Sequence, residues 1–204
     1  MGWTISWEEF VSYTADFMTV SEEICDGWVW QGDKERSGSA YIVKKIQLQM
    51  PADTYDCKQE TNENCDDLSV VEFEESHSVA VAESADLECT WEYHVLYSIS
   101  YATPVLYFNA FYRDGRLLPL EVIWKRHGTE TEALQHMRWE ALSQQEHPIL
   151  RRPFYQLHPC KTAEFLSHHL GSSLNPVVTW LSSIGRTVGL HLDNEYSKLV
   201  NKNV

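Results

Sequence analysis

One cysteine stands in a setting that favours nucleophilic chemistry. Cys160 follows His158 and Pro159, at the point where a short extended run gives way to a helical pattern that begins at Lys161. The positive end of a helix dipole and an adjacent lysine both stabilise the thiolate, which is the nucleophilic form. Pro159 fixes its own φ and restricts His158, so the loop before the thiol is stiff. A free cysteine is also commonly inert and buried, and this context alone leaves both interpretations open.

Motifs for other kinds of catalytic or cofactor site are missing from the sequence. It has no GxxxxGK or GxGxxG phosphate loop, no HExxH or paired CxxC motif, and no GxSxG nucleophile elbow. His168 and His169 are adjacent, so on a helix they point about a hundred degrees apart and suit one metal ion poorly. We therefore expect neither a metal nor a cofactor.

Two other classes of function stay open at this point. A cysteine hydrolase could use Cys160 with His158 or His147 as its base, although His158 is awkwardly close in sequence and no orienting acid is obvious. A non-catalytic adaptor could bind a partner through an exposed strand edge.

The charge of the chain limits its partners. The 204 residues include 30 acids against 16 lysines and arginines, a net charge of −14. Such a surface disfavours nucleic acid and anionic membranes as partners. Residues 51–92 hold thirteen acids and only Lys58 as a base. We interpret this segment as a solvated acidic loop at 51–67 followed by a strand with one wet face, and an acidic docking surface is the alternative.

The five cysteines indicate a reducing compartment, because they form no CxxC pair and no dense disulfide framework. Cys57 and Cys65, which lie in the polar loop, could pair only in an oxidising compartment. No apolar signal segment follows the first residue, and no window of about 18 apolar residues occurs. We therefore expect a cytoplasmic protein with no transmembrane segment.

The first half of the chain is predicted to form a helix followed by strands. Apolar residues spaced three, four and seven apart predict a helix from Trp7 to about Ile24, and Ser6 with Glu9 resembles a capping box. β-Rich runs predict a strand at 41–50 and a weaker one at 68–83.

The second half begins with the clearest β signal and ends in helices. The run from 91 to 112 has one apolar parity, an interruption at 103–104 and a tight turn after it at 114–115. A helical pattern occurs at 129–145, residues 154–157 are predicted to be extended, and further helical patterns follow at 161–170 and 177–184. This order predicts an α+β fold, with an antiparallel sheet of about four or more strands flanked by an N-terminal helix and C-terminal helices.

The stretch around the cysteine resembles a known active site. Residues 154–162, Phe-Tyr-Gln-Leu-His-Pro-Cys-Lys-Thr, are similar to the His-Pro-Cys active site of the autophagy E2-like enzymes, distant relatives of ubiquitin-conjugating enzymes. Further segments that resemble this family are 93–98, 101–108, 114–116, 119–120 and 146–150. The similarity covers most of residues 3–190, and it implies a single ubiquitin-conjugating-enzyme-like domain over residues 1–204.

The resemblance also implies a reaction and its partners. Cys160 would accept the ubiquitin-like protein autophagy-related twelve as a thioester from the E1-like activating enzyme autophagy-related seven. It would then pass this modifier to a lysine of autophagy-related five, in support of autophagosome formation. The short loop at 51–67 and the acidic first helix favour this protein-conjugating branch of the family over its lipid-conjugating branch.

One departure from ordinary ubiquitin carriers concerns the oxyanion. Those carriers place a His-Pro-Asn ahead of the cysteine, where the asparagine helps to stabilise the tetrahedral oxyanion. No His-Pro-Asn occurs in this sequence. His158 and Tyr101 are candidates to replace the asparagine. Their structural alternatives are a loop-shaping hydrogen bond for His158 and a packed sheet position for Tyr101.

Overall fold

The computed structural model describes residues 4–50, 87–126, 142–159, 162 and 173–200. Some predictions fall on other parts of the chain and lie outside these described residues. They concern the acidic loop at 51–67 with Cys57 and Cys65, the strand at 68–83, the helix at 161–170, most of the helix at 129–145, and Cys160 itself.

The N-terminal helix forms where the sequence predicts it. Helix α1 spans Trp7–Ile24. Its capping box is present: the Glu9 backbone N–H donates to the Ser6 hydroxyl at 3.1 Å, and the Ser6 N–H donates to the Glu9 carboxylate at 2.7 Å. The helix ends at Cys25, which adopts a left-handed conformation with φ of 54°. Its apolar stripe packs against the sheet and includes Trp7, Phe10, Phe17 and Met18.

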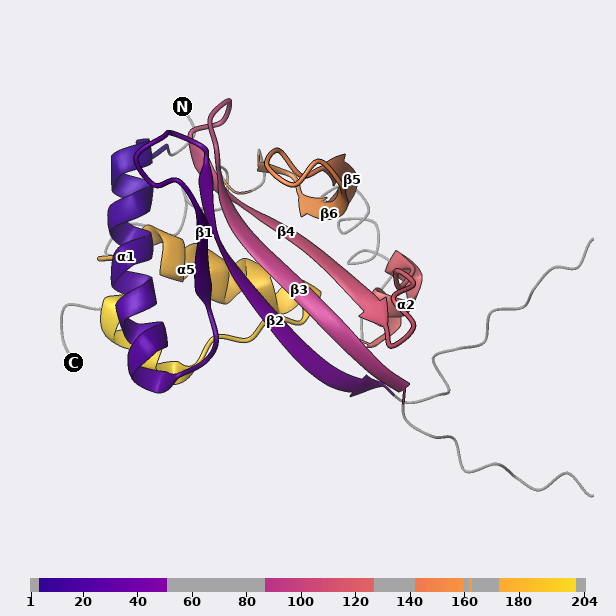
Figure 1. Ribbon diagram of the computed structural model, residues 1–204. Coiled ribbons are helices and arrows are strands. Elements are labelled where there is room, and N and C mark those ends of the chain that lie inside the picture. Colours follow the sequence, from indigo (N-terminus) through magenta and orange to yellow (C-terminus); the bar gives the residue numbers. More distant parts are fainter. Residues whose placement is uncertain (1–3, 51–86, 127–141, 160–161, 163–172, 201–204) are drawn as a thin grey trace, which may run out of the picture.

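In the described part of the chain, six antiparallel strands form one sheet in the order β1-β2-β3-β4-β6-β5, and this confirms the predicted α+β class. The strands are β1 (Val29–Gly32), β2 (Ala40–Met50), β3 (Leu87–Ser98), β4 (Thr103–Tyr112), β5 (Leu142–Glu146) and β6 (Pro153–Leu157). Long strands β2, β3 and β4 make up the centre, with α1 and α5 together on one side (Figure 1).

Two details of the strand prediction are wrong. Pro104 does not interrupt a strand: it is the second residue of β4 and pairs with Tyr97, while the break is the turn at 99–102. Proline is tolerated near the start of a strand, where one missing N–H costs little. Residues 142–145 are not helical, because Leu142–Glu146 pairs along its whole length with β6. Strand pairing overrides a local helical pattern of this kind.

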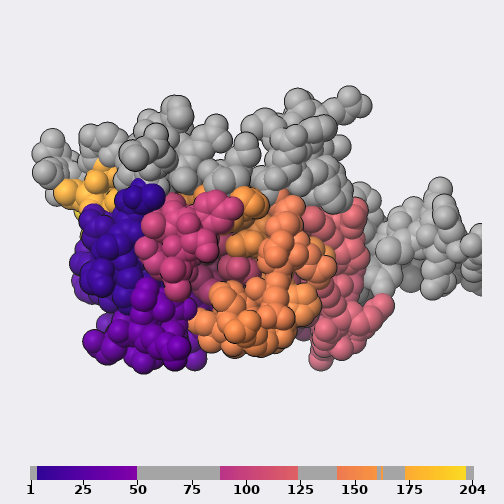
Figure 2. Space-filling model, turned by 90° about the horizontal axis from the view of Figure 1, so that it is seen from above, coloured from indigo at the N-terminus to yellow at the C-terminus, as the bar shows by residue number. Residues whose placement is uncertain are grey.

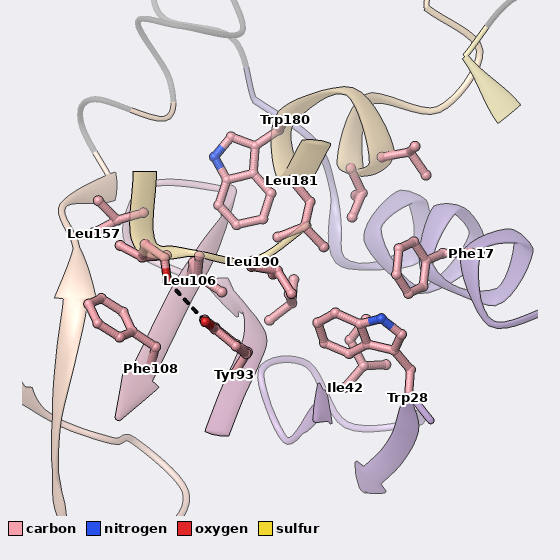
Figure 3. Close-up of a cluster of buried hydrophobic side chains, with 14 of the residues drawn as sticks. Phe17, Trp28, Ile42, Tyr93, Leu106, Phe108, Leu157, Trp180, Leu181 and Leu190 are labelled. Atoms are coloured by element: carbon pink, nitrogen blue, oxygen red, sulfur yellow. Dashed lines mark hydrogen bonds between the residues drawn. The ribbon is translucent and has the colours of Figure 1, made fainter. Parts of the chain in front are cut away.

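The main core lies between the sheet and the two helices. On β3 the first three residues of the predicted apolar parity, Trp91, Tyr93 and Val95, are completely buried, whereas Ile99 and Tyr101, predicted to continue it, lie in the turn and are exposed. The three buried residues pack with Leu106 and Phe108 of β4 and with Trp180 and Leu181 of helix α5, which spans Pro176–Ile184. The Tyr93 hydroxyl donates to the Val188 carbonyl at 2.9 Å, so this polar group is satisfied inside the core (Figure 3).

The opposite face of the sheet is also buried. Tyr41, Leu96, Val105, Tyr107 and Phe154 form a second apolar cluster there, covered by Ile149 and Leu150 of the connection between β5 and β6. The space-filling view shows the orange β5–β6 hairpin beside the pink atoms of the central strands (Figure 2). Glu92 and His94, which alternate with the first core residues on β3, are therefore buried as well.

Short helices complete the described part of the chain. Helix α2 spans Leu120–Arg126 and follows a tight turn at Gly115, whose φ is 84°. Helix α5 stops at Gly185, as predicted, and the chain continues as 3-10 helices η2 (Gly185–Val188) and η3 (Asn194–Leu199). Among the described residues, none of the helices has the length and apolar character that crossing a membrane requires.

Candidate active site

Strand β6 leads directly into the sequence around Cys160. It is extended as predicted and buries Phe154 and Leu157, one on each face of the sheet. His158 follows it and is half-buried, and Pro159 is buried. On the other side of Cys160 in the sequence, the buried Thr162 hydroxyl accepts a hydrogen bond from the Trp180 indole N–H at 3.2 Å. Cys160 itself lies outside the described residues.

The turn between β3 and β4 is the second part of the site. The carbonyl of Ala102 accepts from the Ile5 backbone N–H at 2.8 Å, and the Tyr97 hydroxyl donates to the Ile5 carbonyl at 2.8 Å. Both bonds fasten the turn to the segment that enters α1. Ala102 is held at φ of 49°, a left-handed conformation that an alanine adopts only where its surroundings impose it. The turn therefore presents Tyr101 in a defined position.

The structure brings Tyr101 and His158 together. The centroids of their rings are 5.7 Å apart, and the ring planes meet at 78°, an edge-to-face contact. Tyr101 keeps 43% of its surface exposed, so this is not a packed sheet tyrosine. A phenol O–H and an imidazole N–H can each donate to an oxyanion, and His158 stands two residues before Cys160 in the sequence.

His147 lies in the interior with partners at both of its ring nitrogens. Its side chain is fully buried. Its Nδ1 accepts from the backbone N–H groups of Ile149 and Leu150 at 3.2 and 3.1 Å, and its Nε2 lies 3.0 Å from Nδ1 of His94. Because both ring nitrogens already have partners, His147 is unsuited to act as the base of a cysteine hydrolase.

The buried charge beside these histidines is Glu92. Its Oε1 lies 3.0 Å from Nε2 of His94 and 3.3 Å from both the Lys45 ammonium and the Arg152 guanidinium. Burial acts to raise the pKa of Glu92, but the hydrogen bond with His94 and these charges outweigh it and lower the pKa to about 2. Burial lowers the pKa of His94, and it lowers the pKa of His147 to about 4.

Sequence reasoning missed Glu92 and His94. The available signal was two polar residues, spaced two apart, in a run whose other parity is strongly apolar. Such a pattern normally indicates a solvated face, and only the position of the hairpin shows that this face is covered.

Two further cysteines are described. Cys25 is exposed at the end of α1, and Cys89 is buried in β3. Cys25 follows the last residue of the helix, and its thiol donates a hydrogen bond to the Glu22 carbonyl. Neither stands in a setting that favours a nucleophile.

Comparisons with known proteins show which family the chain resembles. A family model described as "Autophagocytosis associated protein, active-site domain" matches residues 9–195. The human ubiquitin-like-conjugating enzyme ATG10 is 36% identical, over 93% of this chain and 90% of that protein. The enzyme of the same name from Arabidopsis thaliana is 33% identical over 58% of this chain and 57% of its own length. The one from Dictyostelium discoideum is 30% identical, over 56% of each.

The family match covers most of the described elements, from α1 through the sheet to η3, and it includes Tyr101, His158 and Cys160. The human relative aligns with nearly the whole chain. The chain therefore belongs to the family of autophagy ubiquitin-like-conjugating enzymes.

Proposed function

We propose that the chain accepts the ubiquitin-like protein autophagy-related twelve as a thioester on Cys160 and transfers it to a lysine of autophagy-related five. The E1-like enzyme autophagy-related seven supplies the activated modifier in this proposal, and the reaction takes place in the cytoplasm. The observation that carries the proposal is the contact between the Tyr101 and His158 rings, at the end of the strand that leads to Cys160. Membership of the conjugating-enzyme family supports it.

The reaction has two steps. In the first, the Cys160 thiolate attacks the carbonyl carbon of the modifier's C-terminal thioester; a new C–S bond forms, and the activating enzyme's cysteine leaves as a thiolate. In the second, a lysine amine attacks the same carbonyl. A C–N bond forms, the C–S bond to Cys160 breaks, the amine gives up a proton to solvent, and Cys160 leaves as a thiolate. Covalent catalysis of this kind divides one difficult transfer into two easier steps.

Tyr101 and His158 are proposed to stabilise the oxyanion in the second step. Both steps pass through a tetrahedral intermediate whose oxygen carries negative charge. In a chain without His-Pro-Asn, the rings of Tyr101 and His158 are in contact beside the nucleophile's segment, and each ring carries a hydrogen-bond donor. Their separate attachments, to the β3–β4 turn and to β6, support a fixed geometry.

One experiment separates this proposal from a hydrolase and from an adaptor. The purified chain is incubated with activating enzyme, modifier and ATP, and the products are run on a non-reducing gel. An adduct that reducing agent removes supports the conjugating enzyme. Cleaved modifier without an adduct supports a hydrolase, and neither product supports an adaptor.

A further inference from the structure

We infer that the buried hydrogen-bonded network of Glu92, His94 and His147 positions the β5–β6 hairpin, and with it the segment that carries Cys160. His94 and His147 are thus positioning residues and do not touch the reacting atoms. The inference rests on the proposed function of Cys160, and it extends that function to a part of the fold that the reaction does not use directly.

The hairpin is attached to the rest of the sheet by few backbone pairs. Strand β6 pairs with β4 only at Tyr107↔Gln156 and Phe108↔Tyr155, whereas β3 and β4 pair continuously from Cys89↔Tyr112 to Ser98↔Thr103. Within the described residues, β5 pairs with β6 alone. The ladder therefore leaves much of the hairpin's position to side chains.

Backbone N–H groups fix the direction of the hydrogen bonds in this network. Two backbone N–H groups donate to Nδ1 of His147, so this nitrogen carries no proton. The proton of the neutral ring is then on Nε2, which donates to Nδ1 of His94 at 3.0 Å. His94 in turn carries its proton on Nε2 and donates to Glu92 at 3.0 Å. Every polar group of this network has a partner, and the bond from His147 to His94 joins the hairpin to β3.

Aromatic rings pack around the two histidines and shield their hydrogen bonds from water. Tyr41 stacks on His94 with ring centroids 4.8 Å apart and meets His147 edge-on at 5.1 Å. Phe154 of β6 lies 4.8 Å from the His94 ring and 5.1 Å from the His147 ring. Hydrogen bonds in such a water-poor site are costly to break, because the freed groups find no replacement partner.

Arg152 forms a second link between the same elements. It lies at the base of the hairpin connection, and its guanidinium is 3.3 Å from the Glu92 carboxylate on β3. Its neighbour Arg151 makes an ion pair at 3.0 Å with Glu146, which stays within the hairpin and is exposed. The two arginines therefore differ in one respect that matters here: only Arg152 connects the hairpin to the central sheet.

The link acts on the site through β6. Pro153 begins this strand directly after Arg152, and His158 follows its last residue, so a shift of the hairpin carries His158 away from Tyr101. Displacements of about 1 Å can cost roughly a hundredfold in rate where geometry is critical. We therefore expect the network to influence transfer from Cys160 without contacting substrate.

Two substitutions of His147 separate the effects of the hydrogen bonds at its two ring nitrogens. His147→Asn keeps an oxygen near the position of Nδ1 for the two backbone N–H groups but loses the donor to His94. His147→Gln places an amide N–H near the position of Nε2 and keeps that donor. Discharge of the Cys160 thioester to lysine should be about tenfold slower in the Asn variant, and the Gln variant should recover most of the loss. Equal rates in both variants and the unaltered chain would overturn the inference.

Arg152 and Arg151 provide a matched pair of variants, because both residues are exposed and substitution at an exposed position disturbs folding little. Arg152→Gln should slow discharge several-fold, whereas Arg151→Gln should leave it unchanged. This comparison keeps the inference testable if His147→Asn does not fold, as judged by its melting curve. Equal effects of the two arginine variants would also overturn it.

A spectroscopic measurement tests the bond directions without any partner protein. Proton–nitrogen NMR of the histidine rings at pH 7 should show His94 and His147 neutral and protonated on Nε2, and His94→Phe and His147→Phe assign the signals. A proton on Nδ1 of His147 would contradict the hydrogen-bond directions assigned to this network. If the unaltered protein forms no thioester on Cys160, the proposed function fails; normal thioester chemistry in every network variant means that the positioning role alone fails.

Discussion

Tyr101 lies in a turn and His158 follows a strand, and only the fold brings their rings to 5.7 Å between centroids. Each residue is held by its own element: the turn is fastened to the entrance of α1, and β6 is anchored by its buried side chains. A phenol and an imidazole together can supply the donors that an asparagine supplies in ordinary ubiquitin carriers. We therefore propose that the pair acts in the transfer step.

Removing either donor should affect discharge more than loading. Tyr101→Phe keeps the ring contact and removes only the hydroxyl, and His158→Ala removes the imidazole. Each should slow discharge of the thioester to lysine by roughly a hundredfold while the thioester still forms, since loss of one oxyanion donor costs about that much. The measurement is a single-turnover chase of the loaded protein with acceptor.

Tyr155→Phe is the matched control for this prediction. It removes a hydroxyl from β6 that donates to the Leu118 carbonyl at 3.4 Å, away from Tyr101 and His158. Its discharge rate should stay unchanged. If the Tyr101 and His158 variants lost loading and discharge equally, and with lowered stability, both residues would be structural only.

At the scale of elements, local signals were sufficient for α1 and for one face of β3. The capping box of Ser6 and Glu9 sets the start of the helix through contacts within one turn, which sequence spacing records directly. The apolar parity of Trp91, Tyr93 and Val95 likewise depends only on the alternation of a strand. Both predictions are confirmed because their causes are local.

Elements whose state depends on distant partners were predicted poorly. Strand β1 is short and mostly exposed, so it has no apolar pattern to detect. Strand β5 carries a local helical pattern and becomes extended only through pairing with β6. The burial of Glu92 and His94 requires the β5–β6 hairpin, far along the chain, so no periodicity on β3 reveals it. The contact of Tyr101 with His158 has the same origin.

The buried histidines should make stability depend on pH. The pKa of His147 is lowered from an ordinary 6.5 to about 4 in the folded protein, because burial disfavours its charged form. The stabilisation is therefore complete above about pH 6.5 and is lost as the pH falls toward 4. Urea unfolding should show a free energy of unfolding that is lower by about 2 kcal/mol at pH 5 than at pH 7.

The variant His147→Asn and a pH range above 4.5 isolate the contribution of His147 to the pH dependence of stability. His147→Asn removes the titrating ring and should flatten the dependence, apart from the contribution of His94, whose pKa is lowered too. Glu92 contributes only below its ordinary pKa of 4.5, since its lowered pKa keeps it ionised above that value in both states. A free energy of unfolding that does not change between pH 7 and pH 5 would contradict the assignment of neutral, buried rings.

At the scale of the whole molecule, the acidic charge is concentrated in one segment. Residues 51–92 carry most of the net charge of −14, and much of that segment lies outside the described residues. The described elements on either side of it, β2 and β3, pair with each other from Tyr41↔Leu96 to Met50↔Leu87. The two strands are thus held in register by their own ladder, and we propose that residues 1–204 form one cooperative domain.

Shortening the acidic loop should leave this domain folded. Replacing residues 53–67 by a short flexible linker removes a segment with no apolar periodicity, and loop length changes closure entropy only slowly. The melting temperature should stay within a few degrees, with one transition by calorimetry. Collapse of the fold, or two separate transitions, would show that the segment is structural or that the chain divides into two units.

The most direct test of the central claim concerns the bond formed at Cys160. The unaltered protein, Cys160→Ser and Cys160→Ala are each incubated with activating enzyme, modifier and ATP, and each product is run with and without reducing agent. The unaltered protein should give an adduct that thiols remove, Cys160→Ser at most a slow adduct that survives them, and Cys160→Ala none, because thioesters are cleaved by thiols and oxyesters are not. A reducible adduct on the Cys160→Ala protein would contradict the assignment of the nucleophile to this residue.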